Sequence, residues 1–410
     1  MATKLRIIFG SKNSRVTGTW VYIGSDYLKL RHHEQRLLGP RLDLSDWFPD
    51  ASDQVRPDFL MWTSQQRVRN RDSLSWWMNH VAGRNNAISP LFSTMVQIVA
   101  LRVWLETDEA AMCGDLTVVC EDPFTVAAVN GALGRQGGGF CEGICNRIRR
   151  FEARTRSLSK GTIRVLGHSL RLLVRWRVAR NFRRDMGQSE GTSIYIIHQC
   201  LDDRNLDDPG PLECDYLANL PTWLTETGMR VVRLPWLANV SADYKDVLTR
   251  LSEEVEEVLI PEDWLSLRDY LRSAVSASRA AFVIEIQSVN GYHWSRPLVE
   301  RERWWQYERS GSLIEFWLLA PAVARFVKNF SKVTYVSTFE MMPPEHVVAW
   351  SLRQLDGPEI INIGYHHAPV SRDFMGYHLV AHICCDHSYD CYMFFHILPS
   401  KILEVEILLK

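Results

Sequence analysis

A glutamate and a histidine follow two predicted strands that lie close together in the chain. Glu340 comes directly after a β-branched and aromatic run at residues 333–338, and His367 comes shortly after a second apolar run at 360–364. A carboxylate can take a proton from a hydroxyl group, and a histidine beside a glutamate is held protonated near neutral pH. These residue types indicate acid–base chemistry or anion binding. A solvated loop glutamate and a structural histidine are the alternative.

The elements around these two residues must bring them together. Residues 344–355 have helical spacing, begin with prolines that suit a first helical turn, and are stopped by Asp-Gly-Pro at 356–358. A strand, a helix and a strand of this length predict parallel pairing with a right-handed crossover, so both strands end at the same edge of the sheet. Open α/β sheets bind ligands at that edge. We therefore expect Glu340 and His367 to converge there.

The same alternation of strands and helices extends through most of residues 115–367. Further strands are expected at 116–120, 193–198, 229–235 and 281–287, with helices at 216–225, 244–258 and 264–280. This pattern predicts an α/β protein with a parallel, doubly wound sheet. Before it, short strand-like runs stand at 5–9 and 20–23, a Pro- and Asp-rich passage follows, and 74–105 has two helical pieces. Trp76 and Trp77 in the first piece are expected in the core, with stacking on a sugar ring as the alternative.

Composition excludes several classes of protein. The 410 residues are 46% hydrophobic and 23% charged with a net charge of −1, which is typical of one large or two globular domains without a general affinity for nucleic acid. Nine scattered cysteines are not a disulfide framework, and the N-terminus has no apolar signal segment, so a cytoplasmic protein is expected. The best apolar run, 313–327, contains Glu315 and is expected to be a core helix.

The segment 147–184 is strongly basic and amphipathic. Its acidic residue, Glu152, stands against thirteen Lys and Arg residues. A helix there would place Ile163, Leu166, Leu170, Leu173 and Val174 on one face and Arg164, Arg171 and Arg175 opposite. A basic helix of this kind can lie on anionic lipid, so these three arginines are predicted to bind a membrane. A solvated basic face on a packed helix is the alternative.

No metal or dinucleotide site is predicted. The acidic loop at 202–208 lacks the alternation of a calcium loop, and the cysteines and histidines after residue 377 form no second pair at zinc-binding spacing beyond His378 and His382. The glycine-rich run at 134–139 follows a predicted helix rather than a strand, unlike a dinucleotide-binding loop.

Two motifs carry a family resemblance. Glu340-Met-Met-Pro-Pro-Glu345 and, at the end of the next strand, Gly364-Tyr-His-His367 resemble the Glu-Asn-x-Pro-Trp-Glu and Gly-Tyr-Gln-His motifs of bacterial surface carbohydrate (O-antigen or capsule) biosynthesis proteins, which look like GT-B glycosyltransferases. Residues 73–77, 89–91, 100–101 and 216–221 are similar too. Met341 and Pro344 replace the expected Asn and Trp, and His366 replaces Gln.

This resemblance implies a Rossmann-like domain on the acceptor side of a GT-B enzyme, whose second, donor-binding domain would be largely missing here. Such a protein transfers a sugar from a nucleotide-sugar, its co-substrate, to a lipid-linked or glycan acceptor, without a bound cofactor or metal. Glu340 is expected as the base, and His367 as the group that stabilises the leaving diphosphate. Glu345, Gly364, Tyr365 and His366 are expected to bind substrate. For Glu345, in the first turn of the predicted helix, capping that helix is the alternative.

The expected organisation is an irregular and helical region at 1–112, a Rossmann-like domain at 113–375 with the basic insert at 147–184, and an atypical tail at 376–410 that reads as a foreign or truncated ending. A peripheral position on the inner face of the plasma membrane would suit a lipid-linked acceptor. The alternative function is a non-catalytic membrane-surface scaffold or a glycolipid-binding protein.

Overall fold

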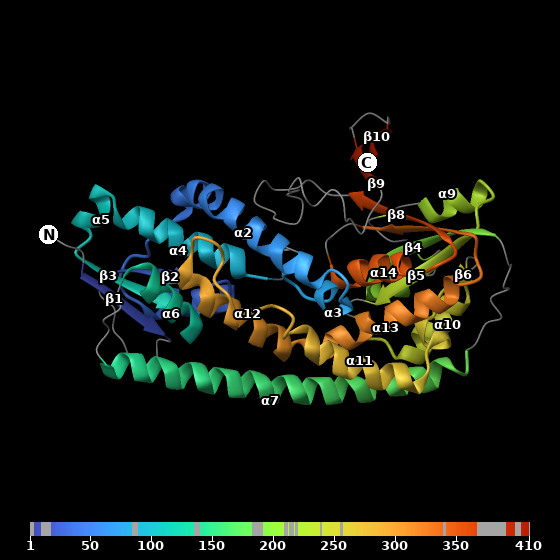
Figure 1. The fold of residues 1–410 in the computed structure, drawn as a ribbon, viewed down its shortest axis with the longest axis horizontal. Coiled ribbons are helices and arrows are strands. Elements are labelled where there is room, and N and C mark those ends of the chain that lie inside the picture. Colours follow the sequence, from blue (N-terminus) through green and yellow to red (C-terminus); the bar gives the residue numbers. More distant parts are fainter. Residues whose placement is uncertain are drawn as a thin grey trace.

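Two parallel sheets stand at opposite ends of an elongated molecule, with long helices running between them (Figure 1). The computed structural model describes residues 4–9, 18–83, 89–134, 140–182, 192–208, 212, 217, 220–237, 240–254, 257–338, 342–366, 391–397 and 403–409; for residues 4, 140–143, 365, 366, 391–397 and 403–409 it describes the backbone alone. The expected α/β class is confirmed at this level.

The first sheet has three parallel strands in the order β1-β3-β2: β1 (Lys4–Phe9), β2 (Thr19–Ile23) and β3 (Asp115–Cys120). The central strand β3 is buried from Leu116 onward, as a near-continuous apolar run should be when both faces of a sheet are covered. We expected this strand to join the strands that follow it in one sheet. That expectation is wrong, because β3 pairs with two strands from the start of the chain.

The second sheet has the order β10-β9-β8-β7-β4-β5-β6. Its strands are β4 (Ser193–Leu201), β5 (Val231–Leu237), β6 (Glu257–Val258), β7 (Lys332–Ser337), β8 (Glu359–His366), β9 (Cys391–Ile397) and β10 (Leu403–Leu409). Every pair is parallel except β9 with β10. Four expected strands are confirmed, and so is the expected parallel pair on either side of α14 (Pro343–Arg353), with Val333 opposite Ile360.

Helices cover both sheets. Around the first sheet lie α1 (Tyr27–Arg36), η1 (Ser45–Trp47), α2 (Phe48–Asn70), α4 (Leu91–Leu105), α5 (Asp108–Met112), α6 (Pro123–Ala132), η3 (His293–Ser295) and α12 (Arg296–Glu308). Around the second lie α3 (Leu74–Trp77), α8 (Asp203–Asp207), α9 (Leu220–Glu226), α10 (Tyr244–Ser252), η2 (Pro261–Trp264), α11 (Leu267–Ala280) and α13 (Ser310–Val327). The helix α7 (Phe140–Ala179) runs along both.

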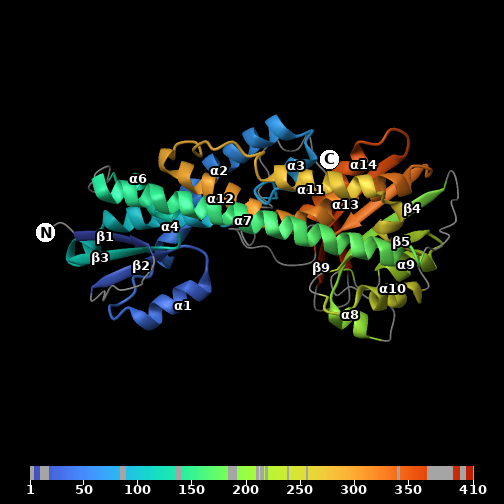
Figure 2. The same cartoon turned by 90° about the horizontal axis from the view of Figure 1, so that it is seen from below.

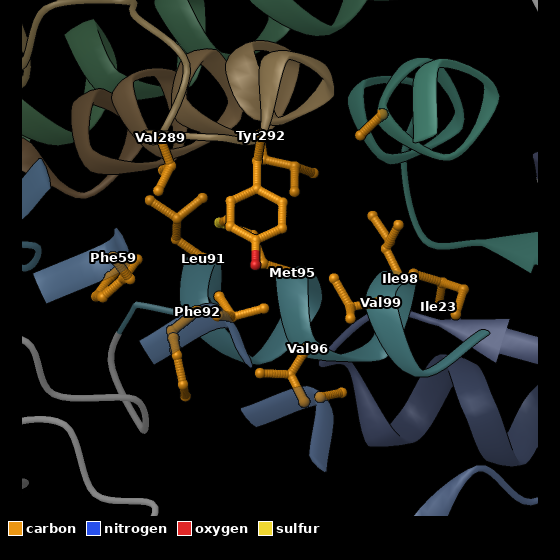
Figure 3. Close-up of a cluster of buried hydrophobic side chains, with 14 of the residues drawn as sticks. Ile23, Phe59, Leu91, Phe92, Met95, Val96, Ile98, Val99, Val289 and Tyr292 are labelled. Carbon is orange, nitrogen blue, oxygen red and sulfur yellow. The ribbon is translucent and has the colours of Figure 1, made fainter. Parts of the chain in front are cut away.

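The core of the first half is built on α4. Figure 3 shows Leu91, Met95 and Ile98 along this helix, with Val289 and Tyr292 reaching it from the segment before α12. All five are buried. A segment from late in the chain therefore completes the core of the N-terminal half.

One further expectation about secondary structure is wrong. Residues 281–287 form an irregular segment rather than a strand, because their backbone bonds to side chains of other elements: the N–H of Glu285 donates to Gln66, and the carbonyl of Ile284 accepts from Arg303. The Pro- and Asp-rich passage forms the 23-residue helix α2, with Pro57 inside it. Trp76 and Trp77 are buried, which confirms their expected core role.

Close contact between helices joins the two halves. A Cβ atom built on Gly161 of α7 would lie 2.6 Å from the carbonyl oxygen of Tyr307, and one on Gly311 of α13 would lie 2.9 Å from that of Arg164. The backbones of α7 and the α12–α13 junction therefore touch. Among the described helices, α13 has the length and apolar content to cross a membrane, but most of it is buried within the protein, as expected for a core helix.

Two glycines of α7 test this contact. Gly161→Ala is expected to lower the free energy of unfolding by about 1–3 kcal/mol, because the added methyl group forces the helices apart. Gly167→Ala is the matched control: a Cβ there meets nothing within 4 Å, so alanine should raise the free energy of unfolding by about 0.5–1 kcal/mol. Urea denaturation measures both. If Gly161→Ala proved as stabilising as Gly167→Ala, the helices would not be in contact.

Candidate functional site

The carboxyl edges of the two sheets face each other. In Figure 1 the strands of the first sheet run from the N-terminal end of the molecule toward its middle, and those of the second sheet run toward the middle from the opposite end. Ligands of open parallel sheets bind beyond the carboxyl ends of the strands, at the point where the order of strands reverses. In the second sheet that point lies between β4 and β7, since β5 and β6 extend to one side and β8 to the other.

At this reversal point lies a buried amide that has no hydrogen-bond partner among the described residues. Ile197 of β4 pairs with Val336 of β7, and Gln199 and Thr338 each lie two positions further along. The Gln199 side chain is 1% exposed, and neither of its amide atoms has a hydrogen-bond partner among the described residues. Buried polar groups are nearly always paired. Gln199 is therefore well placed to bond to a ligand at this edge.

His198 lies just below the edge, on the opposite face of β4. Its Nδ1 is 2.6 Å from the hydroxyl oxygen of Tyr335. Burial lowers the pKa of His198 to about 4, so the ring is neutral at physiological pH. A neutral, hydrogen-bonded imidazole in the core positions β4 against β7 and does not carry charge to a substrate.

Glu345, predicted to bind substrate or to cap the helix that follows, has contacts at the start of α14. It is buried, one carboxylate oxygen accepts from the hydroxyl of Thr338 at 3.0 Å, and the other accepts from the N–H of Met342 at 3.1 Å. The contact with Met342 caps the start of α14, and the contact with Thr338 ties that helix to the residue that follows β7.

The predicted catalytic residues Glu340 and His367 lie outside the described residues. The strands that lead to them are adjacent and parallel, with Ser337 opposite Gly364. Gly364 is buried within β8. Tyr365 and His366 are the last residues of β8, where their backbones pair with β9; their side chains are outside the described part.

The edge of the first sheet has a pocket of about 250 Å³. Strand β2 ends there in Gly24-Ser25, and Asp26 caps α1 by accepting from the N–H of Lys29. The residues that line the pocket include Tyr22, Asp26, Tyr27, Arg41, Asp43 and Gln97. Carboxylates, an amide, a guanidinium and phenol rings together suit a neutral ligand rich in hydroxyl groups.

At this edge, the backbone N–H group that could bind an anionic ligand is already bound by a carboxylate of the protein. Glu121, directly after β3, accepts from the N–H of Ser25 at 2.6 Å. A Cβ on Gly24 would lie 2.5 Å from the same carboxylate oxygen, so the loop fits around Glu121 only with glycine there. Burial, and then the charge of Glu121, raise the pKa of Tyr22, which keeps its hydroxyl protonated. A phosphate is therefore disfavoured in this pocket.

The sequence carried part of the signal for this pocket. A strand followed by Gly-Ser-Asp predicts a turn and a helix cap at this position. Gln97 bonds to both the N–H and the carbonyl of Gly24 from α4, 73 positions along the chain. No local pattern predicts such a contact.

Two of the three predicted membrane-binding arginines are paired with other groups of the protein. Arg164 donates to the carbonyl of Glu308 at 3.1 Å, and Arg175 donates to Glu315 at 3.0 Å. Arg171 is exposed.

The acidic loop serves structural bonds. Asp202 caps α8, and Asp203 accepts from the backbone and hydroxyl of Ser241. Within the described ranges no three His, Cys, Asp or Glu side chains cluster as they would around a metal ion.

The buried His198 predicts a pH dependence of stability. Its pKa in the folded protein, about 4, is below the value near 6.5 expected when unfolded. The unfolded chain therefore binds a proton more readily, and stability is lost as pH falls from about 6.5 to 4. The loss from this residue is about 3 kcal/mol. Chemical denaturation across this range should show a shallower slope for His198→Gln. An unchanged slope would mean that His198 is not buried in its neutral form.

Comparison of the chain with known protein families, with curated proteins and with solved structures finds no match.

Proposed function

We propose that this protein is a GT-B-like glycosyltransferase, which binds a nucleotide-sugar and a hydroxyl-bearing acceptor between its two sheets. The observation that carries the proposal is the pair of parallel sheets whose carboxyl edges face each other. Each edge of this kind is a ligand-binding position. Two such edges give one binding position each for a donor and an acceptor, the two substrates that group transfer brings together.

The chemistry of the two edges supports a division of roles. The pocket beside β2 offers side chains for hydroxyl groups, and its anion position is filled by Glu121. It suits the acceptor sugar. At the edge of β4 and β7, the buried amide of Gln199 has no hydrogen-bond partner among the described residues, and its NH2 group can donate to an oxygen of a ligand. This edge suits the diphosphate of the donor. This division differs from our expectation that the donor half is absent.

The proposed reaction needs a base and a stabilised leaving group. The acceptor oxygen attacks the anomeric carbon of the sugar and loses its proton to Glu340, while the bond from that carbon to the diphosphate oxygen breaks. His367, protonated beside Glu340, stabilises the charge that develops on the diphosphate. The motif resemblance suggests that the acceptor belongs to bacterial surface polysaccharide synthesis, on a lipid carrier or a growing glycan.

The first test is ligand binding at Gln199. Uridine, guanosine and cytidine diphosphates should be screened for an increase in melting temperature, because a ligand that binds the folded state raises it. Gln199→Leu should abolish this increase and yet stabilise the free protein by about 1 kcal/mol, since it removes an unpaired buried amide. If all three diphosphates leave wild type unchanged, or if Gln199→Leu binds as wild type does, the donor site is not at this edge.

The second test is turnover. The rate of nucleoside diphosphate release should be measured with a panel of nucleotide-sugars, because both transfer and hydrolysis release this product. Glu340→Gln and His367→Ala are each expected to lower its rate at least about a hundredfold, the usual contribution of a positioned acid or base. Glu359→Gln is the matched control, because Glu359 starts β8 at the opposite edge of the same sheet, where it pairs with Lys332. Equal rates in all three variants would contradict the proposed roles.

A further inference from the structure

The outward face of α7 is apolar. Ile163, Leu166, Leu170 and Val174 recur at helical spacing and are 69%, 61%, 65% and 63% exposed. The same helix buries Val165 and Leu172 against the rest of the protein. A helix that packs in a soluble core normally presents polar residues to water on its other face. This second apolar face is therefore unpartnered.

Helix α11 extends the apolar face. Its residues Leu267, Leu271 and Val275 are 50%, 64% and 51% exposed. The two helices pack side by side, with the rings of Trp176 and Tyr270 5.9 Å apart, and Figure 2 shows both from below. Tyr270 is the α11 residue at this contact, and Leu271 follows it in the chain. We call the exposed apolar residues of these two neighbouring helices the α7–α11 surface.

This surface is also strongly basic. Six of its arginines are exposed, and in the described part of the chain none of them forms an ion pair or a side-chain hydrogen bond: Arg156, Arg171, Arg177, Arg268, Arg272 and Arg279. Among the described side chains of α7 and α11, Glu152 is the exposed acid, because Asp269 is buried and paired with Arg325. These arginines therefore have no paired counter-charge among the described residues.

The positive charge of the α7–α11 surface indicates what kind of partner binds it. A second copy of the chain on this surface would bring unpaired arginines against unpaired arginines, and like charges oppose such a contact. An anionic bilayer supplies both missing partners, since its headgroups pair with arginine and its acyl boundary accepts the apolar rows. Helix α7, 40 residues long, runs along the edge of the whole molecule, as a helix lying in the plane of a membrane would (Figure 1).

We infer that the α7–α11 surface binds the surface of an anionic phospholipid bilayer. Of the three arginines that the sequence analysis predicted for membrane binding, only Arg171 is part of this surface. Arg164 and Arg175 are paired with Glu308 and Glu315. The inference goes beyond the proposed transfer reaction and does not depend on it. Membrane binding would bring the two sheet edges to an acceptor carried by a lipid.

Flotation of the full chain with vesicles tests the inference without any sugar donor. The chain should float with vesicles of phosphatidylglycerol and phosphatidylcholine mixed one to one, and remain in solution with phosphatidylcholine alone. Arg171→Ser with Arg177→Ser should weaken the binding at least tenfold, because each cation near an anionic surface contributes about fivefold. Leu166→Ser with Leu170→Ser should also abolish flotation. Leu28→Ser with Met112→Ser is the control, since these residues are 80% and 81% exposed on other helices.

Each outcome decides the inference. Loss of flotation in both α7 variants, with the control bound as wild type, supports it. Failure of the wild type to float, equal flotation on neutral vesicles, or a dimer in solution that Leu166→Ser with Leu170→Ser dissociates would overturn it. All substituted residues are exposed, and a circular dichroism melt shows whether each variant is folded. Normal flotation without turnover would count against the proposed transferase reaction alone.

Discussion

The packing of α7 against α12 and α13 is the contact on which the rest of the structure depends. The backbones approach so closely at Gly161 and Gly311 that neither position has room for a side chain. Ion pairs flank this contact, with Arg154 on Glu300 and Arg175 on Glu315. Helix α12 belongs to the first half and α13 to the second. Their joint attachment to one long helix sets how the two sheets stand relative to each other, and so how their carboxyl edges face.

A buried charged group ties α12 to the first of these edges. Arg301 lies between Asp122 and Glu302, at 3.4 and 3.2 Å. Asp122 also caps α6 by accepting from the N–H groups of Phe124 and Thr125. Breaking a buried pair of this kind leaves an uncompensated charge, which is strongly unfavourable. Since Glu121 directly precedes Asp122, the same network holds the carboxylate that shapes the pocket beside β2.

Helix α7 has two different apolar faces, and this explains why its composition was ambiguous. One face, with Val165 and Leu172, packs on the protein, and paired arginines lie beside it. The other face is exposed and carries arginines without partners. A basic amphipathic pattern alone does not say which face is covered. The ion pairs with Glu308 and Glu315 decide it, because they hold the arginine side against the protein.

Local sequence patterns were enough to predict the helices and strands that consist of one apolar run with clear start and stop signals. The unit of β7, α14 and β8 follows from two buried runs, a proline start and an Asp-Gly-Pro stop, because these signals lie within each segment. Tertiary contacts decided the membership of β3 in a separate sheet and the irregular course of residues 281–287. The sequence of a strand shows that it must be buried but not which strand it pairs with. Contacts between distant segments, such as Gln97 with Gly24 and Tyr307 with Gly161, cannot be predicted from sequence periodicity, because the two partners share no local pattern.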